Sequence, residues 1–306
     1  MLRPLAGHGR YDYAPITRRP DYEWPDGRRL AVYLGFNIEH FEFGRGLGAR
    51  LAPSGDPDVL NYAWRDYGNR VGVWRCLDLF ESLRLPAGVL INTALYDYCP
   101  EVIRAFRDRG DEIIGHGHTN AERQGDMPAA EERALIEACT ARIAAEEGRA
   151  PQGWLSPWIS ESHATPDLLK AAGYSYTLNW CHDDQPTVMR TRHGPLWAIP
   201  YPQELNDIPQ VVGRLAGAEE FARMIVDTHD EMLAQSAAQP LVMGIALHPY
   251  LVGQPHRLAH LRRALEHIVK SGRAWLTTPA AIRDHVEAVL GAQLGRPHVS
   301  TPDTVT

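Results

Sequence analysis

Three ionisable side chains that suit acid–base chemistry each lie where an apolar run of the sequence ends. Glu39 follows one such run, His116 closes a second, and His248 follows a third. Carboxylate and imidazole groups accept and deliver protons near neutral pH, as the hydrolysis of an amide-like bond requires. We therefore predict that Glu39, His116 and His248 are catalytic.

Five further side chains near such run ends are predicted to bind substrate. They are Asn37, Asn120, Trp154, Trp180 and Asp184. In an extended strand Asn37 faces the same way as Glu39, whereas His40 faces the opposite way. Indole rings pack well against a flat ring. The Asp183-Asp184 pair is expected either to accept hydrogen bonds from substrate N–H groups or to orient a catalytic histidine.

His116 and His118 form a His-x-His pair, which is a zinc-ligand pattern when both rings face the same side. A catalytic zinc site needs three protein ligands, and Glu39 or His248 would be the third. Gly117 between the two histidines favours a turn that points the rings apart. In that arrangement the two rings would not bind a common ion. A single divalent ion such as zinc, if bound, is expected on Glu39, His116 and His118.

Apolar runs and amphipathic segments alternate along most of the chain, which is typical of a parallel α/β domain. Strands are expected at 29–37, 87–94, 111–118, 153–156, 174–180, 241–247 and 274–277, with a hairpin at 189–200. Helices are expected at 69–83, 100–109, 129–147, 165–172, 218–235, 257–270 and 279–290. We predict an α/β fold with one irregular (β/α) barrel of about seven parallel strands at 30–290. An N-terminal arm (1–29) precedes the barrel, and a polar C-terminal tail (291–306) follows it.

The composition disfavours several classes of protein. Lys and Arg number 31 against 38 Asp and Glu, so the net charge is −7, which argues against nucleic acid or an anionic membrane as partner. The N-terminal segment lacks the apolar core of a secretory signal, and no apolar run is long enough to span a membrane. The four cysteines form no Cys-x-x-Cys pair, so we expect a cytoplasmic protein without disulfides. Gly-x-Ser-x-Gly and nucleotide-binding glycine motifs are absent from the sequence.

A series of short motifs occurs in a characteristic order along the chain. The motifs are NIEHF at 37–41, YGNRVGVWR at 67–75, GHGHTN at 115–120, GWLSP at 153–157, DD at 183–184 and LHP at 247–249. This set resembles the polysaccharide deacetylase (NodB-type) superfamily over about residues 20–290. It more closely resembles the branch of metal-independent allantoinases and cyclic imide hydrolases. The resemblance implies a NodB-type barrel and hydrolysis of a C–N bond other than a peptide bond.

Several positions depart from the pattern of the metal-dependent deacetylases in that superfamily. Asn37 and Glu39 stand where those enzymes carry an acidic pair, and Asn120 stands where the second histidine of a His-x-x-x-His pair is expected. The late histidine is retained as His248. Because a neutral amide is a poor zinc ligand and Asn37 cannot act as a base, the resemblance with these departures implies catalysis by Glu39 and the histidines, and no metal cofactor is favoured.

We expect a hydrolase that opens a small cyclic imide, amide or ureide by general acid–base catalysis. One alternative is a metal-dependent N-deacetylase of an N-acetyl sugar or related amide, with the ion on Glu39, His116 and either His118 or His248. A second alternative is a catalytically inactive barrel that only binds ligand. The arm and the family resemblance also predict a homo-oligomer, and the small molecule is the only other partner expected.

Overall fold

The computed structural model describes residues 6–45 and 48–294 of the chain. Within these residues nine strands form one sheet in the order β6-β7-β5-β4-β3-β2-β1-β8, and β9 also pairs with β1. The strands are β1 (Leu30–Ile38), β2 (Ala87–Ile91), β3 (Glu112–Gly115), β4 (Gly153–Trp154), β5 (Tyr176–Thr177), β6 (Thr187–Thr191), β7 (Gly194–Ala198), β8 (Leu241–Leu247) and β9 (Trp275–Thr277). Neighbouring strands are parallel except β6 and β7, which form the predicted hairpin.

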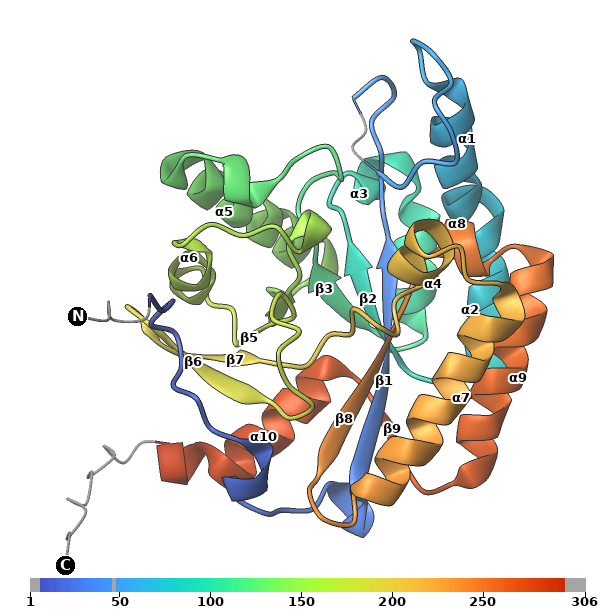
Figure 1. Cartoon of the computed structure of the whole chain (residues 1–306). Helices are drawn as coiled ribbons and strands as arrows, with labels where there is room; N and C mark the ends of the chain where they lie inside the picture. Colours follow the sequence, from blue (N-terminus) through green and yellow to red (C-terminus); the bar gives the residue numbers. More distant parts are fainter. Residues whose placement is uncertain (1–5, 46–47, 295–306) are drawn as a thin grey trace, which may run out of the picture.

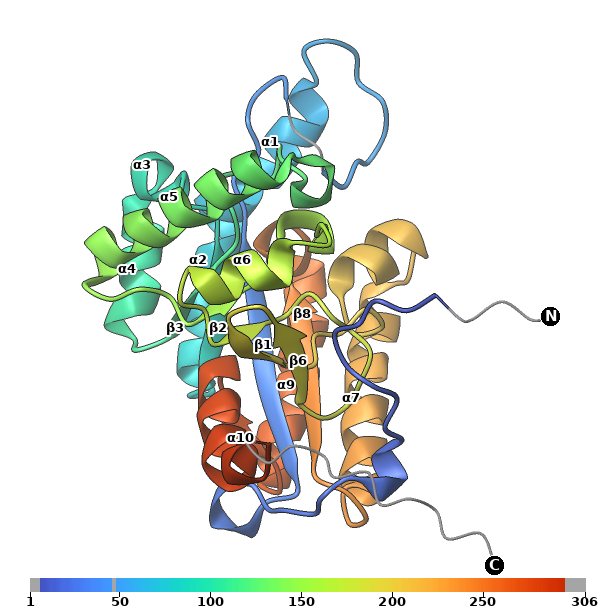
Figure 2. The ribbon, with the colours of Figure 1, turned by 90° about the vertical axis from the view of Figure 1, so that its left-hand side faces the viewer.

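The sheet curls around an interior instead of lying flat (Figure 1, Figure 2). β6 and β8 are its two edges. An isolated parallel bridge between Asn206 and Ala246 joins the segment after β7 to β8. The sheet is therefore an incompletely closed barrel, which confirms the predicted irregular (β/α) barrel.

Helices surround the curled sheet (Figure 1). The α-helices of the described residues are α1 (Val59–Tyr67), α2 (Val73–Ser82), α3 (Leu95–Tyr98), α4 (Pro100–Asp108), α5 (Ala129–Glu147), α6 (Thr165–Ala171), α7 (Ala218–Gln235), α8 (Pro249–Val252), α9 (Pro255–Ser271) and α10 (Pro279–Leu294). Short helices of other types are the π-helices Gly68–Gly72 and Ile208–Gly213 and the 3-10 helices Ile16–Arg18, Pro25–Gly27, Gln124–Asp126 and Pro157–Ile159. In Figure 1, α2, α7 and α9 lie beside β1 and β8, whereas α5 and α6 lie on the other side of the molecule.

The alternation of side chains along β1 explains both the core and the position of the site. Every residue of β1 is buried. Leu34 and Phe36 point outward into the apolar cluster shared with the helices, whereas Tyr33 points into the barrel interior. Because side chains alternate with a period of two, Asn37 and Glu39 continue the interior row. The polar residues at the end of β1 therefore face the mouth of the barrel.

One predicted helix has a different structure. The sequence predicts a helix at 69–83 with Asn69 as its N-cap. In the structure α1 precedes this segment and runs through the π-helix at 68–72 into α2. The N-cap prediction was wrong because the helical segment begins at Asp58, whose side chain accepts a hydrogen bond from the backbone N–H of Asn61 (3.2 Å). Asn69 lies inside the segment, and its amide binds elsewhere.

The segments before and after the barrel domain are described only in part. Arg10 of the N-terminal arm forms an ion pair with Asp167 at 3.0 Å, so the arm lies against the body. α10 continues past the predicted boundary at residue 290, and the last part of the predicted tail lies outside the described residues. No helix of the described chain combines the length and the apolar character needed to cross a membrane. The homo-oligomer and the cytoplasmic location stay predictions.

Candidate active site

The register of the sheet brings several strand ends to one level. Successive register pairs are Ile38–Ile91, Ile91–Gly115 and Gly115–Trp154. The residues one step further along these strands are Glu39, Asn92, His116 and Leu155. His248 follows Leu247, which pairs with Phe36 of β1. Because parallel strands share their carboxyl edge, side chains from distant parts of the sequence meet at one rim.

Glu39 lies between two imidazole rings at this rim. Its Oε1 is 3.3 Å from Nε2 of His116 and 3.6 Å from Nε2 of His248, and all three side chains are buried. Burial raises the pKa of the Glu39 carboxyl. The charge of His248 and hydrogen bonds from both rings lower this pKa by a larger amount, so that it falls to about 2. Glu39 is therefore a carboxylate at ordinary pH. Its second oxygen, Oε2, is buried without a hydrogen-bond partner.

His248 is held by a carboxylate that sequence reasoning missed. Asp207 accepts a hydrogen bond from Nδ1 of His248 at 2.6 Å and another from the backbone N–H of His248 at 2.7 Å. Burial lowers the pKa of His248, but the charges of Asp207 and Glu39 raise it by more, to about 10. The ring is therefore an imidazolium at neutral pH, with its Nε2 proton toward Glu39. Asp207 is the N-cap residue of the π-helix Ile208–Gly213, well past the end of β7, so no strand-end pattern marked it.

His116 is oriented by the backbone. Its Nδ1 lies 2.7 Å from the carbonyl oxygen of Leu155, which can only accept, so Nδ1 carries a proton. Its other nitrogen, Nε2, faces Oε1 of Glu39 at 3.3 Å. Nε2 of both imidazoles thus faces the same carboxylate oxygen.

Gly117 turns the chain so that His118 leaves the site. β3 ends at Gly115, and Gly117 has a φ of +70°. His118 is exposed, and its Nδ1 lies 3.0 Å from the hydroxyl oxygen of Thr93. The turn expected at Gly117 is therefore present. The ligand set of Glu39, His116 and His118 does not assemble.

Gly117→Ala is expected to lower both stability and turnover. The new Cβ would lie 2.7 Å from Cγ of Pro157 and would add the strain of a positive φ. We expect a loss of about 2–4 kcal/mol in the free energy of unfolding, measured by denaturant titration. Turnover should fall as well, because a displaced turn moves His116.

Gly148→Ala is the matched control for this substitution. Gly148 has the same φ of +70°, but nothing lies within 4 Å of the position its Cβ would take. It should therefore lose only the cost of the backbone conformation, about 1 kcal/mol, with turnover unchanged. Equal losses of stability in the two variants would contradict the collision with Pro157.

The π-helix at 68–72 supports the backbone at both catalytic loops. The side chain of Asn69 donates a hydrogen bond to the carbonyl oxygen of Glu39 at 2.8 Å. Gly72 lies so close to Pro249 that a Cβ would be 2.1 Å from the Pro249 carbonyl oxygen. Pro249 directly follows His248, so this single segment fixes the chain on both sides of the site. π-helical turns are rare and occur frequently at functional sites.

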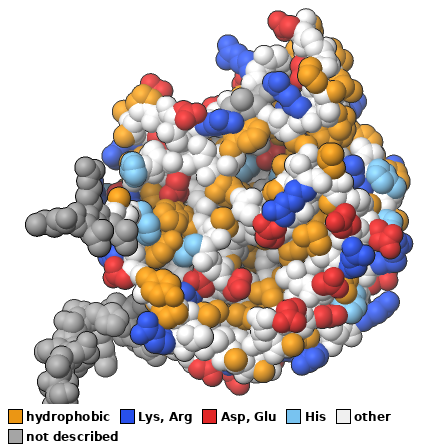
Figure 3. Space-filling view, viewed as in Figure 1, with side chains coloured by type: hydrophobic (Ala, Val, Ile, Leu, Met, Phe, Trp, Pro, Cys, Tyr) orange, Lys and Arg blue, Asp and Glu red, His pale blue; other side chains and the backbone are white. Residues whose placement is uncertain are grey.

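A cavity of about 140 Å³ opens beside the catalytic side chains, and the predicted Asn37 and Asn120 line it. Asn37 donates to the hydroxyl of Tyr201 (2.9 Å), and the side-chain oxygen of Asn120 accepts from Asn92 (3.1 Å). The hydroxyl of Tyr250, also on the wall, is buried without a partner. Figure 3 shows the surface notched at this end, between the projecting segment with α1 and the part with α5.

Three predicted substrate-binding residues lie outside this cavity, so their assignment is corrected here. Trp154 is fully buried in a separate apolar cluster and donates to Gln124 (3.1 Å). It belongs to the outward-facing row of β4, and the next residue faces the cavity instead. Trp180 packs against Tyr11 of the N-terminal arm at 5.6 Å between ring centroids, and Asp184 is exposed. Both lie past the short strand β5, in a segment that the arm covers.

Trp158 takes the position at the cavity wall that was expected for other indoles. Its φ of +66° turns the chain, and its Nε1 donates to the carbonyl oxygen of Asn120 at 3.2 Å. An indole therefore does border the cavity, from the loop after β4 rather than from the strand.

The donor groups of the cavity do not fit a single divalent ion. Zinc needs three ligand atoms close to one point. Among the described residues, the ligand atoms of Glu39, His116 and His248 do not all lie within 4.8 Å of one another. None of the three forms such a group with other candidate ligands. The amide oxygen of Asn120 is already bonded to Asn92. The residues present therefore support chemistry carried by their own protons.

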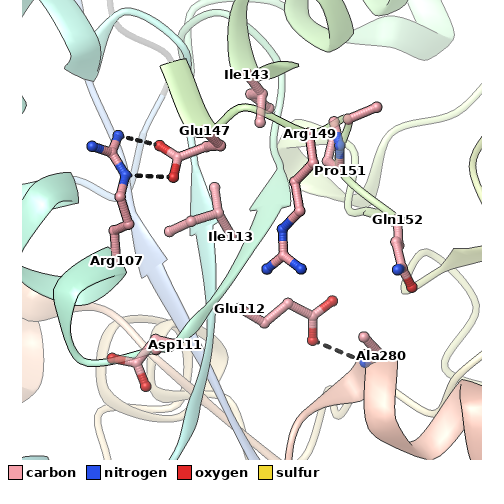
Figure 4. Close-up of a pocket in the computed structure, with 12 residues that line it drawn as sticks. Arg107, Asp111, Glu112, Ile113, Ile143, Glu147, Arg149, Pro151, Gln152 and Ala280 are labelled. Atoms are coloured by element: carbon pink, nitrogen blue, oxygen red, sulfur yellow. Dashed lines mark hydrogen bonds and ion pairs between the residues drawn. The ribbon is translucent and has the colours of Figure 1, made fainter. Parts of the chain in front are cut away.

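A second cavity, of about 190 Å³, lies near the amino ends of β3 and β4 (Figure 4). Its carboxylates have partners. Glu147 accepts two hydrogen bonds from Arg107, at 2.6 and 2.5 Å, and Glu112 accepts one from the backbone N–H of Ala280 at 2.9 Å. Since no imidazole is found among its described lining residues, this cavity lacks the acid–base set of the first.

The chain is similar to proteins named as deacetylases and to an allantoinase. A family model described as Polysaccharide deacetylase matches residues 62–177. A polysaccharide deacetylase homologue of Schizosaccharomyces pombe is 24% identical over 295 residues, which cover 86% of this chain and 91% of the relative. A peptidoglycan deacetylase of Helicobacter pylori is 24% identical over 245 residues, which cover 69% and 82%. The solved structure of PuuE allantoinase is 25% identical with a TM-score of 0.80, covering 91% of this chain and 98% of that one.

These findings confirm the resemblance to the polysaccharide deacetylase superfamily, with an allantoinase among the structural neighbours. The similarity indicates a hydrolase that acts on C–N bonds other than peptide bonds. The segment matched by the family model contains His116 but ends before Asp207 and His248 and begins after Glu39. The catalytic roles of these residues stay predictions.

Proposed function

We propose that this hydrolase opens a small cyclic imide, amide or ureide at a ring C–N bond. The observation that carries the proposal is the Glu39 carboxylate set between two imidazoles beside a cavity of about 140 Å³. Pockets for drug-sized ligands measure about 300–1,000 Å³, so a single small ring suits this cavity better than a chain of sugars. The allantoinase among the structural neighbours supports the same substrate class, because allantoin is a cyclic ureide.

The three side chains divide the work of hydrolysis. Oε2 of Glu39, which lacks a partner, accepts a proton from the water that attacks the ring carbonyl. His116 donates toward the oxygen on which negative charge develops. His248 then delivers its Nε2 proton to the ring nitrogen as the C–N bond breaks. One C–O bond forms, one C–N bond breaks, and one water molecule is consumed.

The low pKa of Glu39 is compatible with a role as base, because it depends on the positive charge of His248. When His248 gives its proton to the leaving nitrogen, that charge disappears and the proton affinity of Glu39 rises. The proton that Glu39 took from water then passes to His248, whose Nε2 lies 3.6 Å from the other carboxylate oxygen, Oε1. The pair is thereby restored for the next cycle.

Purified protein is expected to open at least one ring in a panel of hydantoin, succinimide, phthalimide, a dihydropyrimidine and allantoin. The loss of ring absorbance and the appearance of the ring-opened acid by chromatography are the measurements. N-acetylglucosamine oligomers are the comparison substrates. Deacetylation of the oligomers with every ring left intact would contradict the proposal. Clear binding of a ring without turnover would favour an inactive binding barrel.

A metal-dependent N-deacetylase is the second candidate, and the names of the sequence relatives favour it. Activity before and after treatment with a chelator separates the two candidates. Ring opening that persists at a metal content far below one ion per chain would rule out the deacetylase. Activity that disappears on chelation and returns with added zinc would instead favour it.

A further inference from the structure

A second group of metal-ligating side chains lies away from the catalytic cavity, between α7 and α9. His229 and Asp230 are neighbours on α7, and His267 lies on α9. Each of these residues offers one ligand atom, and the three atoms all lie within 4.8 Å of one another. Among the described residues no other group of three His, Cys, Asp or Glu side chains meets this condition. The two helices lie side by side (Figure 1).

The position of this group separates it from the proposed hydrolysis. His229 lies in the second half of α7, which leads into the start of β8. His248 instead follows the carboxyl end of β8, whereas the group lies on α7 and α9. Neither imidazole of the group lines the catalytic cavity.

The three side chains converge on one carboxylate oxygen. Oδ1 of Asp230 lies 2.8 Å from Nδ1 of His229 and 2.8 Å from Nε2 of His267. The two rings are nearly perpendicular, at 89°, with centroids 5.6 Å apart. Two imidazole nitrogens and one carboxylate oxygen thus surround a common point from two helices. Ligand atoms of a tetrahedral zinc site are about 3.4 Å apart, so each nitrogen needs to move about 0.6 Å away from the Asp230 oxygen to admit an ion.

The surroundings of His229 also suit a ligand. His229 is fully buried, and its other ring nitrogen, Nε2, lies 3.4 Å from the hydroxyl oxygen of Ser271. A histidine that binds a metal through one nitrogen normally donates its other N–H to a nearby acceptor. Asp230 is exposed and His267 is half-buried, which leaves an open direction for entry of the ion and for a water molecule as fourth ligand.

We propose that His229, Asp230 and His267 bind a divalent transition-metal ion such as Zn²⁺, which joins α7 to α9. The nitrogen-rich ligand set favours zinc, nickel or copper over calcium or magnesium, which prefer oxygen ligands. The ion has a structural role and touches neither substrate nor reacting atoms. A measured metal content near one ion per chain would then come from an ion bound between α7 and α9 and not from an ion in the catalytic cavity.

The test is a titration of the tag-free full chain with ZnCl₂ after treatment with a chelator. Isothermal calorimetry should give one saturable site, and the thermal unfolding midpoint should rise with zinc concentration. His267→Ala and Asp230→Asn, at solvent-accessible positions, should weaken binding by about tenfold or more and remove the thermal shift. His256→Ala is the matched control, because His256 is an exposed histidine on α9 outside the group.

Glu39→Gln separates this site from the catalytic one. It should bind zinc as the wild-type chain does, and His267→Ala should keep wild-type turnover. Zinc binding that is lost in Glu39→Gln but kept in His267→Ala would place the ion in the catalytic cavity and overturn the proposal. The absence of binding to the wild-type chain at millimolar zinc would overturn it as well and leave a purely hydrogen-bonded contact between the helices.

Discussion

Glu39→Gln is expected to lower kcat for ring opening by about 100-fold or more, which is the usual contribution of a general base. The substitution keeps the size of the side chain but removes the negative charge between His116 and His248. Water attack then lacks its proton acceptor. Initial rates at saturating substrate measure the effect, and the dissociation constant of the same ring should change far less than kcat.

His118→Ala is the matched control from the same rim motif. Its ring is exposed and contacts Thr93 instead of the cavity, so turnover should stay close to that of the wild-type chain. Near-normal turnover in Glu39→Gln would remove Glu39 from the mechanism. Losses of similar size in both variants would indicate general damage to the rim and not a specific role for the carboxylate.

The sequence predicted the positions of site residues correctly where the alternation of side chains continues to the end of a strand. β1 is an uninterrupted buried strand, so the period of two carries over to Asn37 and Glu39 and places both in the interior. β8 likewise ends immediately before His248. Since parallel strands end at a common edge, the convergence of Glu39, His116 and His248 followed from these patterns without any knowledge of the helices.

The remaining parts of the site depend on tertiary structure that leaves no local pattern. Asp207 contacts His248 from the start of a π-helix, directly after the bridge of its neighbour Asn206 to β8. Asn69 is a residue type that often caps helices. In the structure the preceding helix continues through it, and its amide donates to the carbonyl oxygen of Glu39 instead. Trp154 was misplaced because β4 has only two residues, so the inward and outward rows could not be told apart from sequence.

The missed residue, Asp207, carries the second large prediction. Asp207→Asn is expected to move the alkaline limit of kcat/KM to lower pH by about 1–2 units. His248 must be protonated to act as an acid, and its pKa of about 10 keeps kcat/KM constant until that pH. Burial favours the neutral ring, and the charge of Asp207 at 2.6 Å opposes it. In Asp207→Asn that charge is absent, so the pKa of His248 falls. His248→Ala removes the acid itself, so its turnover should fall by about 100-fold and the alkaline limit of kcat/KM should disappear.

The same proton affects folding, with a sign that follows from the raised pKa. Because the pKa of His248 in the folded chain lies above its ordinary value of 6.5, protonation favours the folded state. This contribution is complete below about pH 6.5 and is lost as the pH rises through about 10. Asp207→Asn should therefore reduce the free energy of unfolding most near neutral pH, because burial raises the pKa of Asp207 and the carboxyl loses its charge at low pH. Asp184→Asn, which removes an exposed carboxylate, is the control for both measurements. An alkaline limit of kcat/KM that stays in place in Asp207→Asn would assign the titration to another group and deprive His248 of its role as the acid.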